Sequence, residues 1–277
     1  MSVQPAEAEA LAAGLPRLLL AAERLAHAVA PGAHGRRRTG AGENFWQFRE
    51  FRNGDDSRRI DWRRSASADR LFLREREWQA QATIQLSLRA HPGMDFRSAA
   101  SLPTKRERAT LLLLATASLL LRSGERVALA GATPPLGGSA ALDEIAAALL
   151  RGSQAPINPQ INPSVDFRAR VVAFGDFLEP DPVFRHVSGG AVMQILDPAE
   201  CDFPYRGRIL FEGFSGEPPV ESAKAEGWAA AYRARIAAQR QAVAGAATRA
   251  GQTALFHRTD AAPAAALAAL YQALAQP

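Results

Sequence analysis

Apolar residues along most of the chain form short continuous runs, separated by longer segments in which they recur every three or four residues. Such runs indicate strands buried on both faces, and the longer period indicates helices. The expected strands are residues 82–88, 126–132, 170–175, 191–196, 208–211 and 253–257. The expected helices are residues 6–30, 105–122, 139–150, 180–187, 223–247 and 264–275. This alternation predicts a doubly wound α/β fold, a mostly parallel sheet with helices on both faces.

Two segments precede the alternation. Residues 6–30 are rich in Ala and Leu, and Pro16 is expected to interrupt or restart the helix there. Residues 35–77 are charged with interleaved aromatic residues, which indicates short strands and turns. We therefore expect three parts: a helical segment at 1–34, a basic strand and turn segment at 35–77, and an α/β domain at 78–277.

Composition excludes several classes of protein. The 277 residues are 47% hydrophobic and 22% charged, as in soluble globular proteins. The one cysteine, Cys201, rules out an internal disulfide and any metal site with several cysteine ligands. No apolar run reaches the roughly 18 residues that span a bilayer. The first residues lack the basic and apolar regions of a secretory signal, so a cytoplasmic protein is expected.

Positive charge is concentrated in one segment. Only two of the 33 basic residues are lysines, Lys105 and Lys224. Between Arg36 and Arg76, twelve arginines stand against seven acids, and this excess equals the net charge of the whole chain, +5. Arginine binds both carboxylates and phosphates, so the segment is either a face for a polyanion or an internal network of ion pairs. The interleaving of acids and arginines favours the network.

The sequence contains no clear catalytic motif. The glycine-rich segment 35–42 holds three arginines but lacks the pattern of a phosphate-binding loop. Cys201 lies between two acids, which disfavour a reactive thiolate. The acids Asp55, Asp56 and Asp61 are candidates for a metal cluster, but the arginines among them favour ion pairs. We therefore expect no enzymatic activity, no cofactor and no bound metal.

A dense pattern between Gly40 and Glu75 resembles the signature of the DUF58 family. The matching stretches are G-A-G-E-N-F at 40–45, R-E-F-R-N-G-D-D-S-R-R-I-D-W at 49–62 and L-F-L-R-E at 71–75. Phe51 and Ser67 stand where the family pattern has Tyr and Arg. The order of elements after residue 78 also fits the family, so the resemblance extends over most of the chain.

The resemblance implies a fold like that of the von Willebrand factor A (vWA) domain and a role as an adaptor for MoxR-type AAA+ ATPases. The signature residues expected either to form a contact surface or to hold the segment together are Arg36, Arg37, Arg38, Arg49, Gly54, Asp55, Arg58, Asp61, Trp62, Arg74 and Glu75. We expect Asp61 to pair with Arg49 or Arg58. We expect Trp62 to be buried or pinned, and Gly54 to adopt positive φ in its turn.

The resemblance also allows a test for a metal-ion-dependent adhesion site. Its motif, D-x-S-x-S, follows the first strand of a vWA fold and is often followed by Met in this family. Met94 fixes the register, so Arg89, His91 and Gly93 stand at the three ligand positions. All three ligand types are lost, and a guanidinium would repel a metal ion. Asp176, after the third buried strand, is retained, so we expect an Arg89–Asp176 salt bridge in place of the metal.

Three functions are compatible with these features. The first is a protein-interaction module that works with a MoxR-type ATPase in assembling or remodelling another complex. The second is a basic nucleic-acid-binding protein that uses residues 36–76 and whose affinity falls steeply with salt. The third is a metal-dependent hydrolase that uses Asp55, Asp56, Asp61 and Asp176. We favour the first, since acids are interleaved with the arginines and arginines lie beside every carboxylate cluster. The sheet edge would then present Arg89, His91, Thr133 and Asp176.

Overall fold

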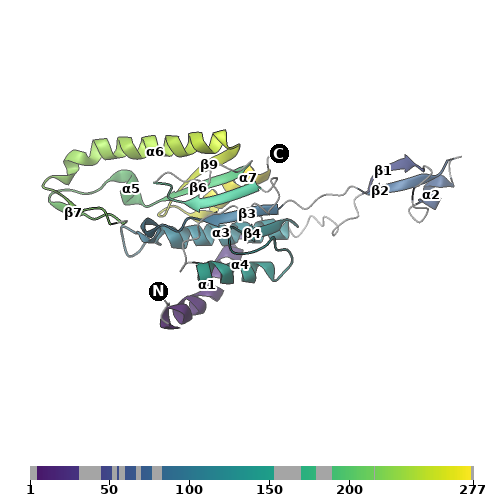
Figure 1. Ribbon diagram of the computed structural model, residues 1–277, viewed down its shortest axis with the longest axis horizontal. Helices are drawn as coiled ribbons and strands as arrows, with labels where there is room; N and C mark the ends of the chain where they lie inside the picture. The colour runs from purple at the N-terminus through teal and green to yellow at the C-terminus, as the bar shows by residue number, and fades with distance from the viewer. Residues whose placement is uncertain are drawn as a thin grey trace. The chain divides into compact units, whose positions relative to one another are not determined.

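The computed structural model describes residues 5–30, 45–51, 55, 60–66, 70–76, 83–152, 170–178, 189–214 and 216–275. The chain forms two compact units, one made of Met1–Pro31 together with Ala82–Pro277 and the other of Gly32–Gln81. In Figure 1 the larger unit is a layered α/β structure and the smaller one contains a two-stranded sheet.

A five-stranded sheet forms the centre of the larger unit (Figure 1). In spatial order its strands are β4 (Arg126–Leu129), β3 (Thr83–Leu88), β5 (Arg170–Gly175), β6 (Gly190–Leu196) and β9 (Gln252–Arg258). Every neighbouring pair is parallel. The predicted α/β class is confirmed, and the arrangement is consistent with a vWA-like doubly wound fold.

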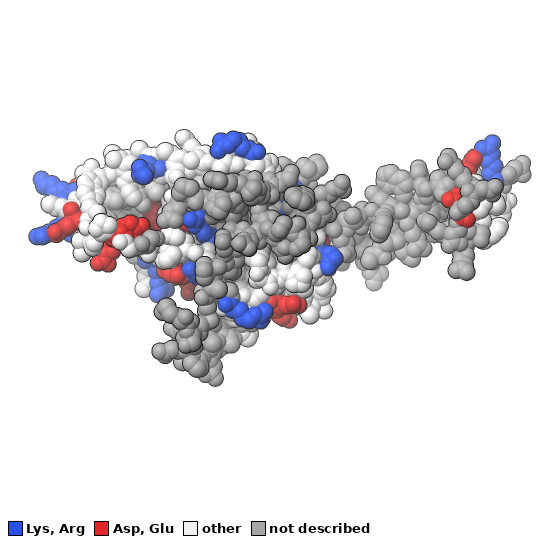
Figure 2. Space-filling model, viewed as in Figure 1, with Lys and Arg blue, Asp and Glu red and all other residues white. Residues whose placement is uncertain are grey.

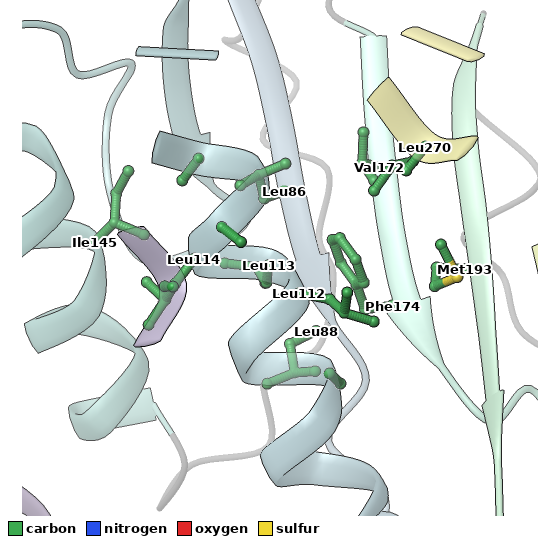
Figure 3. Close-up of a cluster of buried hydrophobic side chains, with 14 of the residues drawn as sticks. Leu86, Leu88, Leu112, Leu113, Leu114, Ile145, Val172, Phe174, Met193 and Leu270 are labelled. Carbon is green, nitrogen blue, oxygen red and sulfur yellow. The ribbon is translucent and has the colours of Figure 1, made fainter. Parts of the chain in front are cut away.

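Helices cover both faces of this sheet. They are α3 (Lys105–Arg122), α4 (Ala141–Gly152), α7 (Pro263–Ala275) and α6 (Ala229–Arg249). Val172 and Phe174 of β5 belong to the large core that contains α3, α4 and α7 (Figure 3). Ala173 lies between them and packs with Val192 of β6 and Val243 of α6 in a second cluster. Successive side chains of a strand point to opposite faces, so a strand covered on both sides is apolar over most of its length.

The N-terminal helix α1 (Pro5–Val29) packs against α3, α4 and α7. Ala22 and Ala26 of α1 are fully buried there. The helix runs through Pro16, so the expected interruption is wrong. Pro16 is exposed, and the carbonyl group that lacks its usual hydrogen-bond donor can be hydrated on that side. Neither α1 nor any other described helix is long and apolar enough to cross a membrane.

Local signals set the ends of α3. Thr104 accepts a hydrogen bond from the backbone of Glu107, whose side chain accepts one from the backbone of Thr104. This capping box starts the helix at Lys105. Beyond the last turn, Gly124 has a φ of +85°, a left-handed conformation that favours glycine. Because α3 follows β3, Lys105 lies near the carboxyl edge of the sheet.

The segment between β6 and β9 begins with α5 (Pro198–Asp202) and β7 (Ile209–Phe211), and β7 confirms the strand expected at residues 208–211. The sequence pattern does not predict α5, β8 (Val220–Ser222) or the 3-10 helix η4 (Ala225–Trp228). β7 pairs with β8 in an antiparallel hairpin. Because η4 occupies the residues before it, α6 begins at Ala229 and not at residue 223. The helix expected at 180–187 lies outside the described residues.

The smaller unit contains β1 (Phe45–Glu50), β2 (Phe72–Arg76) and the single helical turn α2 (Trp62–Ser65). β1 and β2 are antiparallel. Ser65 Oγ donates to the carbonyl oxygen of Asp61 (2.8 Å) and accepts from the backbone N–H of Phe72 (2.9 Å). The N–H of Asp61 donates to the carbonyl of Phe72 (2.8 Å). These bonds fix the I-D-W-R-R-S turn against β2.

His257 is a buried titratable group in β9. Its side chain is 4% exposed, and its Nε2 has no hydrogen-bond partner within the described part of the chain. Burial, and then the charge of Arg108, lower the pKa of His257 to about 4, against an opposing effect of Asp260. The fold therefore favours the neutral imidazole.

We expect this histidine to make the protein less stable in acid. Its folded pKa lies below the ordinary value of about 6.5, so protonation favours the unfolded chain. The contribution of His257 to the free energy of unfolding is complete above about pH 7. It falls by at most about 3 kcal/mol between pH 6.5 and 4. Urea unfolding of the wild type and His257→Gln across this range should show a difference that shrinks as the pH falls, and a constant difference would contradict the assignment.

Candidate functional site at the carboxyl edge of the sheet

The positions that follow β3 and the aspartate that follows β5 meet at the carboxyl edge of the sheet. Arg89 comes directly after β3, and Gly93 lies in the 3-10 helix η2 (Pro92–Asp95). Asp176 comes directly after β5 and is 1% exposed. A Cβ atom added to Gly93 would lie 3.3 Å from Asp176 Oδ2. Arg89 and Gly93, two of the positions that the family resemblance relates to a metal motif, therefore lie beside Asp176.

Arg89 forms the predicted ion pair with Asp176. Its Nε lies 3.7 Å from Asp176 Oδ1, and the two side chains are 13% and 1% exposed. His91 has a local role, because its Nδ1 accepts a hydrogen bond from the N–H of Gly93 (3.1 Å) and caps η2. Thr133 Oγ1 accepts one from the last residue of β4 (2.8 Å). The polar atoms of His91 and Thr133 thus stabilise the ends of their own elements.

A second cation, Lys105, lies deeper than Arg89 and is not among the site residues that the sequence analysis predicts. Its side chain is fully buried. Lys105 Nζ lies 3.1 Å from Asp176 Oδ2 and 2.5 Å from Glu200 Oε1. The ring of Phe96 lies 5.9 Å from the same nitrogen, within the range of a cation–π contact. The ammonium group therefore bridges two carboxylates, one that follows β5 and one that follows β6.

The first turn of α5 positions Glu200. Asp197 accepts a hydrogen bond from the N–H of Ala199 (2.8 Å), and Glu200 Oε2 accepts one from the N–H of Asp197 (2.8 Å). The second carboxylate oxygen of Asp197 accepts from the N–H of Ser98 (3.0 Å), which ties α5 to the segment after η2. Burial raises the pKa of Glu200, and the charge and hydrogen bond of Lys105 oppose this shift.

The four residues Arg89, Lys105, Asp176 and Glu200 are called the ion cluster below. Two cationic and two anionic groups balance its charge. A divalent metal ion does not fit, because the ammonium of Lys105 already lies between the two carboxylates and would repel a second cation. Among the described residues, no three His, Cys, Asp or Glu side chains are arranged to hold a metal. The counter-charge of the two carboxylates is therefore a cation that belongs to the chain.

The ion cluster has the features of a structural element. Its buried ammonium is engaged by two carboxylates, so it is not accessible to a substrate. Cys201 lies beside Glu200, but burial raises the pKa of its thiol and disfavours the reactive thiolate. The cluster joins α3, β5 and α5, and this is the arrangement expected of a group that stabilises the sheet edge.

The signature segment is only partly described. Outside the described residues lie Arg36, Arg37, Arg38, Gly54 and Arg58. For Arg49, Arg74 and Glu75 the structure describes the backbone, which lies in the β1–β2 sheet. Asp55 lies in a bend and is half-buried. Among the signature residues, Asp61 and Trp62 are therefore the ones whose side chains show whether the segment forms a contact surface or a structural framework.

These two residues have different roles. Asp61 caps α2, because its Oδ1 accepts a hydrogen bond from the N–H of Arg64 (2.9 Å). The side chains of its two expected partners, Arg49 and Arg58, lie outside the described residues. Trp62 is 64% exposed, so the expectation that it is buried is wrong. The reason is the shortness of α2, whose single turn buries only Ser65.

Two helix-start motifs in the sequence indicate the positions of Lys105 and Glu200, the two residues of the ion cluster that were not predicted. The stretches T-K-R-E at 104–107 and D-P-A-E at 197–200 both match the capping-box pattern. The first places Lys105 at a helix start after one buried strand, and the second places Glu200 at a helix start after another. Both starts lie at the carboxyl edge of a parallel sheet. Opposite charges at two helix starts on the same sheet edge would have suggested an ion pair between Lys105 and Glu200.

We expect Lys105→Met to lower the free energy of unfolding by about 3–5 kcal/mol at neutral pH, because it leaves two buried carboxylates without a cation. The loss should be smaller in mild acid, where a proton can neutralise Glu200. Urea denaturation measures both effects. Lys224→Met is the matched control, since Lys224 is the only other lysine and is exposed. An equal change in the two variants would contradict the role of the ion cluster.

Arg89→Ala tests whether the site can accept a metal when only the outer cation is removed. We expect a smaller loss of stability than for Lys105→Met, and no saturable binding of Mg²⁺ or Mn²⁺, because the ammonium still lies between the carboxylates. Isothermal titration calorimetry on the wild type and the variant measures this. Saturable binding of either ion at Asp176 would show that the position is open.

Comparison with known proteins gives one match. Residues 47–242 match the family model described as a protein of unknown function, DUF58. No curated protein and no solved structure matches the chain. The matched range contains Trp62 and all four residues of the ion cluster. Because it covers well over half of the chain and includes both the signature segment and the sheet edge, the chain belongs to the DUF58 family.

Proposed function

We propose that the chain is a non-enzymatic protein-interaction module, an adaptor that docks on a MoxR-type AAA+ ATPase. With that ATPase it takes part in assembling or remodelling another protein complex. The observation that carries the proposal is the exposure of Trp62 on a turn that the side chains of Asp61 and Ser65 hold in place through hydrogen bonds.

The α2 turn presents Trp62 in a fixed position. Asp61 and Ser65 are occupied by hydrogen bonds within the turn and to β2. Trp62, Arg63 and Arg64 are exposed. Tryptophan and arginine are the residues most enriched at the energetic centres of protein interfaces, and an exposed tryptophan is costly in water. A rigid turn that carries both therefore favours a protein contact.

The ion cluster supports a contact that does not depend on metal. In a metal-ion-dependent adhesion site, a partner carboxylate completes the coordination of the metal. Here the corresponding cation is Lys105, which is fully buried and already bonded to two carboxylates of its own chain. A partner carboxylate cannot reach it. Binding by this protein therefore relies on exposed side chains.

Nucleic-acid binding is the alternative, because an exposed tryptophan beside arginines can also stack on a base. The smaller unit contains an ion pair between Arg70 and Glu50, whose side chains are 70% and 54% exposed. This pairing is typical of a charge-balanced surface and not of a face for phosphates. The response to salt and to nuclease separates the two functions.

We expect Trp62→Ala to weaken binding to a purified MoxR-type ATPase by at least about tenfold. The free energy of unfolding should change by less than about 0.5 kcal/mol, because the side chain is exposed. Biolayer interferometry measures the affinity, and EDTA should leave it unchanged.

Leu71→Ala is the control for this experiment, since Leu71 is in the same unit and is 42% exposed. It should bind the ATPase like the wild type. Failure of the wild type to bind any MoxR-type ATPase from its own organism would overturn the proposed partner. Binding that disappears with nuclease would favour the nucleic-acid alternative.

A further inference from the structure

Exposed apolar side chains are concentrated in the segment between β6 and α6. Those with large exposed fractions are Leu210 (57%), Phe214 (47%), Val220 (51%) and Trp228 (41%). These four residues are called the hairpin patch. They lie on the β7–β8 hairpin, in its connecting loop and at the end of η4, next to the first turn of α6 (Figure 1). Several large apolar side chains exposed within one short segment are typical of an interaction site.

The hairpin patch rests on a stack of aromatic rings. Trp228 stacks on Phe211 with ring centroids 5.6 Å apart, and Phe211 stacks on Phe203 at 5.8 Å. Phe203 follows α5, the helix that supplies the glutamate of the ion cluster. Phe214 contacts Phe96 edge to face at 5.7 Å, and Phe96 lies beside the ammonium of the cluster. The patch is thus fixed to the same sheet edge that the ion cluster stabilises.

Beyond the patch, α6 is basic along its length. Its arginines, all exposed, are Arg233, Arg235, Arg240 and Arg249. The sequence contains no Asp or Glu from residue 227 to residue 259. Figure 2 accordingly shows basic but no acidic side chains over α6, whereas both kinds gather around β7. Arg235 and Arg249 have no ion pair within the described ranges, so their charges are available to a partner.

The arginines of α6 have a regular placement. Arg235 and Arg249 are 14 residues apart, which is about four helical turns, so they lie on the same side of α6 about 21 Å from each other. Ala238 and Ala242 lie between them on that side and are exposed. Short side chains at these positions allow the backbone of a partner to approach the helix between the two guanidinium groups.

The surroundings of the hairpin patch differ from those of α6. Glu212, Glu217 and Glu221 lie in or beside the hairpin and are exposed. Glu221 forms an ion pair with Arg208 across the two strands. The surface therefore changes from apolar with mixed charge at the hairpin to purely basic along the helix. A partner complementary to it must change in the same direction.

We propose that the hairpin patch and α6 form one docking surface for an acidic protein segment that carries apolar residues at one end. This inference rests on the proposed function, because it assumes a protein partner, and it adds the place and chemistry of contact. The apolar end covers Phe214 and Trp228, and the acidic part follows α6 and pairs with Arg235 and Arg249. A single-stranded nucleic acid is less complementary, because its evenly spaced phosphates would meet the glutamates of the hairpin.

Photo-crosslinking in the native cells tests this surface with the full chain. A photoreactive benzoylphenylalanine replaces Phe214 in one variant and Leu20 in the control, since Leu20 on α1 is similarly exposed at 48%. Crosslinked peptides are identified by mass spectrometry. We expect position 214 to capture a partner segment in which apolar residues adjoin a run of Asp and Glu, and position 20 to capture none.

A charge reversal in the same background tests the role of α6. Arg235→Glu/Arg249→Glu should lower the crosslink yield from position 214 by at least about tenfold, which corresponds to about 1.4 kcal/mol. Arg24→Glu/Arg151→Glu makes the same change in net charge at two exposed arginines on α1 and α4, and should leave the yield within about twofold. Equal losses in both pairs would show that net charge, and not α6, governs binding.

The outcomes separate this inference from the proposed function. A protein captured from position 20 but not from 214 would overturn the docking surface and leave the adaptor role in place. Capture of a neutral or basic segment at 214 would overturn its proposed chemistry. The absence of protein crosslinks at position 214 would also overturn the docking surface, while the adaptor role is judged by the binding experiment with Trp62→Ala. Crosslinks to nucleic acid that nuclease removes would overturn both.

Discussion

A buried cation that belongs to the chain itself holds the carboxyl edge of the sheet together. Lys105 comes from α3, Asp176 from the end of β5 and Glu200 from α5, so one ammonium group joins three elements. Two carboxylates at this depth require a counter-charge, and breaking such a group by removing one partner is strongly destabilising. A metal ion can exchange with solvent, whereas a lysine side chain cannot. The edge is therefore neutralised whenever the chain is folded.

Much of the fold follows from local patterns. Apart from Arg170 and Gln194, the runs that form β5 and β6 hold no polar side chain, because helices cover both faces of the sheet, and this makes them visible in the sequence. The hairpin of β7 and β8 is only partly visible in this way, because the pattern predicts β7 but not its partner β8. Its strands are three residues long, and aromatic contacts such as Phe203–Phe211 hold it in place. Pro16 gives the opposite kind of error, because proline usually interrupts a helix, whereas α1 continues through this exposed position.

The sequence indicates half of the ion cluster. Arg89 and Asp176 stand at positions that the family register relates to each other, so their pairing can be predicted. Lys105 pairs with residues 71 and 95 positions further along the chain. Its capping motif shows where the helix starts but not what its side chain meets. Trp62 shows the same limit, because an apolar residue in a signature suggests burial, and only the shortness of α2 explains its exposure.

An internal cation changes how such a domain can bind a partner. In a metal-dependent site, one partner carboxylate completes the coordination shell, so binding and the integrity of the edge depend on the same atoms. Here the edge is complete without a partner, because Asp176 and Glu200 already share Lys105. In the binding mode proposed above, affinity is spread over exposed groups such as Trp62 and the arginines of α6, which would contribute anchoring and long-range attraction. Stability and binding consequently reside in different residues, and substitution can change one without the other.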